Sequence, residues 1–345
     1  MKLIKHLFIL FTVLLLSFSC ESDNNGPSFS NNVLIINEGN FLSAEGSISG
    51  YNSNTKTSEQ GLYESVNGFA PATTIQALVK HNENLILIGN NPDKVELLST
   101  SLEFKASILS GFTTPYSFAA VGNKGYVTNW GTFNAATYGY DNSSIVVIDL
   151  VNFTILKTIP WDNQPQHVLA SNNKIFVSNV NSNSISILDP ETDEISGSID
   201  TPFGPDKMEL DKNGKMWVIC TSGALLKIDI NSNAIEATID NVSTLGFNEK
   251  MVMSSAKDKI YYLSYTADFT GTLVFEMDIN ATTAPTEPII SGTAFYGLGI
   301  NDQNILFIGD HNNYQGNGTV FMYDLSGNSL GEFESGIVPN GFIFR

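Results

Sequence analysis

The sequence predicts an all-β protein that folds as a seven-bladed β-propeller with four-stranded antiparallel blades. Short runs of β-branched and aromatic residues, too brief for helices, recur along the chain with turn residues between them. The recurrence has a period of about 40 to 50 residues, which is typical of propeller blades. A β-sandwich with accidental regularity is the alternative, but repeats that stay in phase over most of the chain favour the propeller.

The clearest blade defines four strand positions, at residues 165–170, 174–179, 184–189 and 194–199. Matching second strands are expected at residues 34–37, 85–90, 125–129, 216–220, 260–264 and 305–310. Matching third strands are expected at residues 47–51, 95–98, 145–149, 225–229, 273–278 and 320–324. With the clearest blade included, these segments account for seven blades.

The two ends of the propeller are expected to share one blade. The first repeat begins at its second strand, and the chain ends with residues 339–344, which match the first-strand position of residues 165–170. The C-terminal strand is therefore predicted to close the ring, which removes an open sheet edge.

The N-terminus has the pattern of a secreted lipoprotein. Lys2 and Lys5 precede an apolar run at residues 7–16, which is too short to span a membrane, and Ser19 precedes Cys20 as in a lipobox. We predict a lipoprotein signal peptide at residues 1–19, lipidation at Cys20, a lipidated tether at residues 20–31 and the propeller at residues 32–345. An ordinary signal peptide that happens to contain Cys20 is the alternative.

Charge limits the classes of partner. The chain has a formal net charge of −18, and removal of residues 1–19 takes away Lys2 and Lys5, which gives −18 − 2 = −20. Such an acidic surface repels nucleic acids and anionic membranes, so we expect membrane contact through the lipid anchor only. We also expect a monomer. The only arginine is Arg345, which argues against tight recognition of an anionic substrate.

No catalytic or metal-binding motif was found in the sequence. His81, His167 and His311 lack metal-ligand spacing, and nucleophile elbows, phosphate loops and dinucleotide fingerprints do not occur. His167 and His311 fall near the predicted channel rim, where a plain loop role is favoured over a metal role. Cys220 lies in a predicted strand and is expected to be a buried, inert thiol. We therefore expect no metal, no covalent cofactor apart from the lipid, and no enzymatic activity.

One face of the propeller is the predicted ligand site. The loops that join second to third strands, and fourth strands to the next blade, meet on this face and are rich in aromatic and amide side chains, which suit a large neutral ligand. Each such residue also has a structural alternative, as a turn cap or as packing between blades. The candidate ligand-binding residues are Glu38, Asn40, Phe41, Asn91, Tyr116, Trp130, Phe133, Tyr138, Trp161, Gln166, His167, Asn181, Asp206, Lys207, Asn248, Glu249, Tyr265, Tyr296, His311, Tyr314 and Asn340.

The chain resembles the YncE-like seven-bladed propeller lipoproteins of Bacteroidetes, a group that includes the DUF5074 and BtuG-like surface proteins. The resemblance rests on residues 37–41 after the first strand, on the repeated strands of the type seen at residues 184–189, and on Cys20. It implies an outer-membrane lipoprotein on the cell surface, with the periplasmic face as the alternative. BtuG-type members capture vitamin B12 and pass it to a TonB-dependent outer-membrane transporter.

The expected function is therefore capture of a small molecule on the propeller face, with a corrinoid as the leading ligand and a TonB-dependent transporter as the partner. A corrinoid is fringed with primary amides, which exchange hydrogen bonds with Asn, Gln and carboxylate side chains. A glycan- or protein-binding surface module is the first alternative. A periplasmic propeller hydrolase or lactonase is the second, in which carboxylates such as Glu38, Asp206 and Glu249 would act as acid and base.

Overall fold

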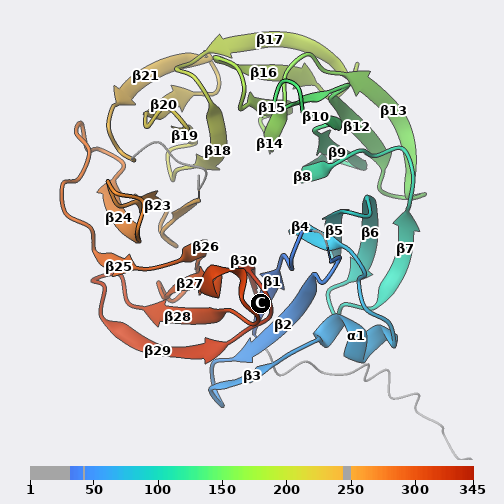
Figure 1. Ribbon diagram of the computed structural model, residues 1–345. Helices are drawn as coiled ribbons and strands as arrows, with labels where there is room; N and C mark the ends of the chain where they lie inside the picture. The colour runs from blue at the N-terminus through green and yellow to red at the C-terminus, as the bar shows by residue number, and fades with distance from the viewer. Residues whose placement is uncertain (1–31, 42, 244–249) are drawn as a thin grey trace, which may run out of the picture.

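The computed structural model describes residues 32–41, 43–243 and 250–345. These residues form seven four-stranded antiparallel sheets arranged in a ring (Figure 1), which confirms the predicted seven-bladed β-propeller. The predicted signal peptide, the tether and Cys20 lie outside the described residues. None of the helices in the described part of the chain has the length and hydropathy of a membrane span.

Each blade contributes one strand to each of four concentric positions. The inner strands are β30 (Pro339–Phe344), β4 (Thr74–His81), β8 (Pro115–Val121), β14 (Pro165–Ser171), β18 (Pro205–Leu210), β22 (Met251–Met253) and β26 (Phe295–Ile300). The second strands are β1 (Val33–Asn37), β5 (Asn84–Asn90), β9 (Lys124–Asn129), β15 (Lys174–Asn179), β19 (Lys215–Cys220), β23 (Lys259–Tyr265) and β27 (Leu306–Asp310).

The third strands are β2 (Ser47–Asn52), β6 (Lys94–Ser99), β12 (Ser144–Asp149), β16 (Ser184–Asp189), β20 (Leu225–Asp229), β24 (Thr272–Asp278) and β28 (Thr319–Tyr323). The outer strands are β3 (Thr57–Glu59), β7 (Phe104–Ile108), β13 (Thr154–Pro160), β17 (Glu194–Asp200), β21 (Ala234–Ile239), β25 (Ile290–Gly292) and β29 (Ser329–Glu334). We number the blades 1 to 7 in the order of their second strands, from β1 to β27.

The C-terminal strand closes the ring, as the sequence predicts. Strand β30 pairs antiparallel with β1, with Ile35 opposite Phe342, so blade 1 has the strand order β3-β2-β1-β30. In Figure 1 the red C-terminal strand lies beside the blue first strand. Both ends of the described chain therefore belong to one sheet.

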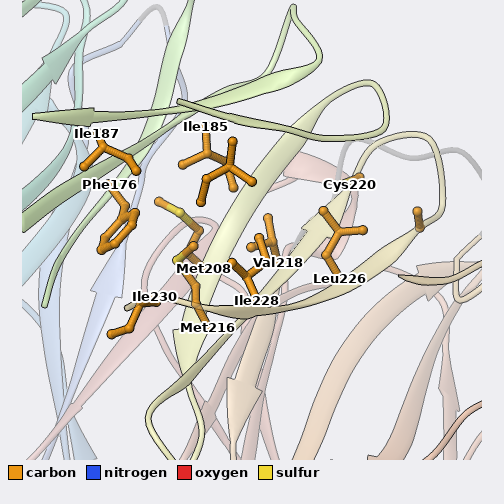
Figure 2. Packing of buried hydrophobic residues seen from close by; sticks show 12 residues of the cluster. Phe176, Ile185, Ile187, Met208, Met216, Val218, Cys220, Leu226, Ile228 and Ile230 are labelled. Carbon is orange, nitrogen blue, oxygen red and sulfur yellow. The ribbon is translucent and has the colours of Figure 1, made fainter. Parts of the chain in front are cut away.

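The core consists of one apolar cluster between each pair of neighbouring blades. Alternation along the second strands produces this arrangement, because successive side chains in a strand point to opposite faces of the sheet. In β15, Ile175 and Val177 pack toward blade 3, whereas Phe176 packs toward blade 5 against Met208. Figure 2 shows the cluster between blades 4 and 5. Burial of each such side chain stabilises the ring by about 1.5–3 kcal/mol.

Cys220 is a member of the cluster in Figure 2 and is fully buried. Burial raises the pKa of its thiol to about 12, and the Asp206 carboxylate adds to the effect. The thiolate, which is the reactive form, is therefore negligible at neutral pH. This confirms the prediction of a buried thiol that acts as a small apolar side chain.

Two insertions depart from the repeated blade. Helix α1 (Leu62–Asn67) lies in the connection between β3 and β4, and it was not predicted, because six residues are too few to show helical periodicity. Its Tyr63 is buried and donates a hydrogen bond to Glu96 Oε2 at 2.9 Å. The second insertion is a hairpin of β10 (Thr132–Asn134) and β11 (Gly139–Asp141) between β9 and β12. In addition to these two insertions, a short 3-10 helix, η1 (Asn312–Tyr314), lies in the loop after β27.

The strand order places the connections of the blades on two faces. Because strands within a blade alternate in direction, second-to-third connections and fourth-to-first connections lie at the same end of the strands. We call this end the channel-mouth face. It carries the β10–β11 hairpin and the loops in which the sequence predicts a ligand site.

Candidate functional site

A pocket of about 640 Å³ opens on the channel-mouth face, a volume typical of small-molecule sites. Inner strands or loops of blades 1, 2, 3, 4, 5 and 7 contribute to its lining. It brings together these residues from the sequence-based prediction: Glu38, Phe41, Tyr116, Trp130, Tyr138, Gln166, Asn181, Asp206 and Tyr296. The remaining lining residues are Gln76, Asn90, Thr114, Tyr140, Gln164, Val180, Phe203 and Thr221.

Blade 3 supplies an aromatic wall to the pocket, made of Tyr116, Trp130, Tyr140 and Phe133. The Tyr116 and Trp130 rings stack with centroids 4.4 Å apart, and Tyr140 lies 5.0 Å from Trp130 and 5.6 Å from Phe133. The β10–β11 hairpin carries the outer part of this wall and holds Tyr138 at its turn, 86 % exposed. A large aromatic side chain this exposed is available to contact a ligand.

The base of the hairpin is fixed to the blade. The Trp130 amide donates to the Thr114 carbonyl at 3.0 Å, and the Ser143 hydroxyl donates to the Trp130 carbonyl at 2.5 Å. Gly131 has a φ of 93°, and a Cβ at this position would overlap the Asp141 carbonyl oxygen. Glycine is therefore required where the hairpin leaves β9.

The opposite side of the pocket contains a network centred on the Glu38 carboxylate. Gln76 Nε2 donates to its Oε1 at 3.1 Å, and the Tyr296 hydroxyl and Asn340 Nδ2 donate to its Oε2 at 3.0 and 3.1 Å. Burial raises the pKa of Glu38 above its ordinary value of 4.5, although the Lys250 ammonium and the hydrogen bonds from Tyr296 and Gln76 act in the opposite direction. Lys250 also donates to Asn340 Oδ1 and lies 5.2 Å from the centre of the Tyr296 ring.

A second polar chain runs across the inner strands of blades 3, 4 and 5. His167 Nδ1 lies 3.4 Å from Ser117 Oγ, and His167 Nε2 lies 3.4 Å from Asp206 Oδ1. Burial keeps the pKa of His167 well below 6.5, with a further contribution from the positive charges of Lys207 and Lys250. The Asp206 carboxylate favours the protonated ring, but burial and the two lysines outweigh it, so His167 is neutral at pH 7.

Trp161 lies outside the pocket. It is buried between blades 3 and 4, and its Nε1 donates to Asn179 Oδ1 at 2.7 Å. Asn179 is fully buried at the end of β15, and its Nδ2 donates to the hydroxyls of Ser184 and Ser186. The Trp161 side chain is therefore committed to blade packing.

The other predicted residues that the structure describes are not part of the pocket lining. Asn40 donates to Glu45, Asn91 to the Phe41 carbonyl, and Lys207 forms an ion pair with Glu209 at 3.2 Å. The His311 ring stacks on Tyr314 at 4.2 Å and meets Tyr296 edge-on at 5.8 Å, while Tyr265 contacts Phe269. Phe133 belongs to the aromatic wall, His167 to the polar chain and Asn340 to the Glu38 network. Asn248 and Glu249 lie outside the described residues.

The sequence-based prediction missed Gln76, which donates to both Glu38 and Asn90. Helix α1 lengthens the connection that leads into blade 2, and this obscures the start of β4 in the sequence. The pairing of first and second strands gives the correct alignment of the blades. Thr74 lies opposite Asn90 in blade 2, just as Pro165 lies opposite Asn179 in blade 4. A comparison of strand starts across blades would have found Gln76.

The lining suits a neutral polar ligand. It contains aromatic, amide and hydroxyl side chains and the carboxylates Glu38 and Asp206, and none of the described lining residues is Lys, Arg or His. Within the described ranges, no group of three or more His, Cys, Asp or Glu side chains is arranged to hold a metal ion. Aromatic faces and amides can bind a ring system that carries amides or hydroxyls.

Solved structures with the same fold come from proteins of varied description. A quinonprotein alcohol dehydrogenase-like protein from Bacteroides thetaiotaomicron superposes with a TM-score of 0.71 and 16% identity, over 92% of this chain and 78% of that chain. A functionally unknown protein from Desulfotomaculum acetoxidans gives a TM-score of 0.67 and 12% identity, over 91% and 98%. Hydrazine synthase from Kuenenia stuttgartiensis gives 0.56 and 15%, over 75% and 85%. At these identities the likeness shows the fold alone.

Comparison by sequence shows the family. The search of curated proteins found no match to this sequence. A family model described as a domain of unknown function, DUF5074, matches residues 31–328, which is most of the propeller. The chain therefore belongs to the DUF5074 family.

Proposed function

We propose that this protein is a non-enzymatic capture protein that binds a neutral, amide- or hydroxyl-bearing small molecule in the channel-mouth pocket. A corrinoid is the leading ligand. The pocket itself carries the proposal: it combines a stacked aromatic wall with the side chains of Gln76, Gln164, Gln166 and Asn181. Flat rings supply contact area at low entropic cost, and amides pair with the amide fringe of a corrinoid.

The proposed setting is the outer membrane, with the protein anchored through a lipid on Cys20 and exposed at the cell surface. A TonB-dependent transporter is the proposed recipient of the ligand. These parts of the proposal rest on the sequence pattern of residues 1–31 and on the resemblance described above. Metabolic labelling with a fatty-acid analogue tests the anchor, because Cys20→Ala should abolish label incorporation and Cys220→Ala should leave it unchanged.

Titration with cyanocobalamin tests the ligand. The chain from residue 27 onward retains every residue that the structure describes. Calorimetry should give saturable binding with a dissociation constant at or below about 1 μM, which corresponds to about −8 kcal/mol. Neutral oligosaccharides form the second arm of the experiment, since the aromatic wall also suits the apolar face of a sugar. Binding of an oligosaccharide without binding of cyanocobalamin would replace the corrinoid by a glycan.

A second candidate function, hydrolysis, rests on the chain of Ser117, His167 and Asp206. A neutral histidine between a serine hydroxyl and a carboxylate is the arrangement that activates a nucleophile. Ser117 is only 7 % exposed and does not line the pocket, which favours the binding function. A fluorophosphonate probe separates the two: labelling that Ser117→Ala removes would support a hydrolase, whereas the capture protein should remain unlabelled.

A further inference from the structure

Gln166 Oε1 and Trp130 Nε1 belong to the pocket lining, are buried and have no hydrogen-bond partner among the described residues. Asp206 Oδ1, a third buried atom of the lining, lies 3.4 Å from His167 Nε2. Gln166 is only 7 % exposed. Buried polar groups in folded proteins are almost always paired, because an unpaired group loses its hydrogen bonds to water without compensation. Two such atoms in one pocket indicate that a ligand supplies the missing partners.

Other amides of the same pocket differ in this respect. Asn181 Nδ2 donates to Gln164 Oε1 at 2.8 Å, and Gln76 Nε2 donates to Asn90 Oδ1 at 3.2 Å. The other two tryptophans also have partners: Trp161 Nε1 donates to Asn179, and Trp217 Nε1 donates to Asp211 Oδ2 at 3.1 Å. The missing hydrogen bonds therefore distinguish Gln166 and Trp130 from comparable side chains.

The two residues lie on adjacent blades, and Tyr116 contacts both Trp130 and the sequence neighbour of Gln166. The Tyr116 ring stacks on Trp130 and meets the His167 ring edge-on at 5.9 Å, and His167 directly follows Gln166 on β14. Both residues line the pocket, and neither polar atom has a partner among the described residues. The resulting pair consists of one acceptor, the Gln166 carbonyl oxygen, and one donor, the Trp130 indole N–H.

We propose that this pair binds a primary carboxamide of the ligand, whose N–H donates to Gln166 Oε1 and whose carbonyl oxygen accepts from Trp130 Nε1. One carboxamide carries both groups on the same carbon atom, so in this proposal it pairs both side chains at once. The stacked rings of Tyr116 and Trp130 then lie beside the body of the ligand. This inference rests on the proposed function and deepens it, because it names the chemical group that the pocket selects.

Benzamide and acetophenone are the matched probes, since they differ only in the replacement of the amide NH2 by a methyl group. The chain has three tryptophans, so protein labelled with ¹⁵N-tryptophan gives three indole signals, of which Trp130→Phe identifies one. Benzamide should shift the Trp130 signal and leave those of Trp161 and Trp217 in place. Acetophenone, which lacks the N–H donor, should bind about tenfold more weakly.

The variant Gln166→Leu should weaken benzamide binding about tenfold and remove its preference over acetophenone, whereas Gln303→Leu, at an exposed turn on the opposite face, should change neither. Equal binding of the two probes to the unaltered protein overturns the carboxamide site and leaves the pocket as a binding site. A Trp130 signal that responds to cyanocobalamin but not to benzamide would likewise overturn the carboxamide site and leave the pocket as a binding site. If none of the three compounds shifts any signal, both the carboxamide site and the corrinoid ligand are wrong, and only the oligosaccharide titration can still support a capture function.

Discussion

Tyr296 and Glu38 are 258 positions apart in the sequence, yet the Tyr296 hydroxyl donates to Glu38 Oε2 at 3.0 Å. Glu38 directly follows β1, and Asn340 of the closing strand β30 donates to the same oxygen. The carboxylate therefore joins blades 1 and 7 at the ring closure, and through Gln76 it also joins blade 2. Since Glu38 also lines the pocket, the pocket and the ring closure share one side chain.

Glu38 makes the stability of the ring depend on pH. Burial raises the pKa of its carboxyl in the folded state above the ordinary value of 4.5. Between these two pKa values the folded chain binds more protons than the unfolded chain, so the free energy of unfolding falls as pH rises through this range. In Glu38→Gln this fall should be absent, so the unfolding free energy of the variant relative to the unaltered protein should rise with pH.

Urea unfolding from about pH 4 to about pH 8 measures this difference. Other groups with shifted pKa values, such as His167 and Asp93, occur in both proteins and largely cancel in the comparison. Glu191→Gln, at an exposed turn, should follow the unaltered protein throughout. Parallel curves for Glu38→Gln and the unaltered protein would show that the Glu38 pKa is the same in the folded and unfolded chains.

The contact between blade 7 and the closing strand leaves no room for a side chain at Gly309. A Cβ added there would overlap the Pro339 carbonyl oxygen on β30. Gly309→Ala should therefore push β30 away from β27 and lower the free energy of unfolding by about 1–3 kcal/mol. Gly197→Ala is the control, because its Cβ would have Ile187 Cδ1 at 3.9 Å as its nearest neighbour, and it should change stability by no more than about 0.5 kcal/mol. Equal urea midpoints for the two variants would contradict close packing at the seam.

Substitution by phenylalanine should destabilise the protein more at Trp161 than at Trp130. Trp161→Phe removes the N–H that donates to the buried Asn179 Oδ1 and should cost about 1–3 kcal/mol of unfolding free energy. Trp130→Phe removes an N–H that has no partner among the described residues, so it should cost clearly less. Thermal unfolding of both variants makes the comparison. A larger loss at Trp130 would indicate that its indole supports the fold.

Much of the fold could be predicted because every blade repeats one pattern. Alternation within β15 sends Ile175 and Val177 to one neighbour and Phe176 to the other, and the same alternation recurs in each second strand. The position of the site followed from the strand order. Helix α1 could not be predicted, because its residues are fixed by burial of Leu62 and Tyr63 against blades 1 and 2 and not by a periodic pattern.

The direction of individual rim side chains could not be predicted either. Trp161 and Tyr116 both lie at entries to inner strands, but Trp161 packs between blades and Tyr116 lines the pocket. The difference depends on Asn179, which accepts the Trp161 N–H from the end of a separate strand. Contacts of this kind join residues on separate strands, and they cannot be read from the sequence of a single repeat.

Tyr138 should contribute to binding and not to stability. Its side chain is 86 % exposed at the turn of the β10–β11 hairpin and lines the pocket, so Tyr138→Ala removes little buried area. The free energy of unfolding should change by no more than about 0.5 kcal/mol, while the affinity for cyanocobalamin should fall about tenfold, as for an aromatic contact residue. Ile195→Ala, exposed on the outer strand β17 away from the pocket, should change neither. Calorimetric titration and urea unfolding of both variants measure the two quantities, and an unchanged affinity in Tyr138→Ala would exclude the Tyr138 side chain from ligand contact.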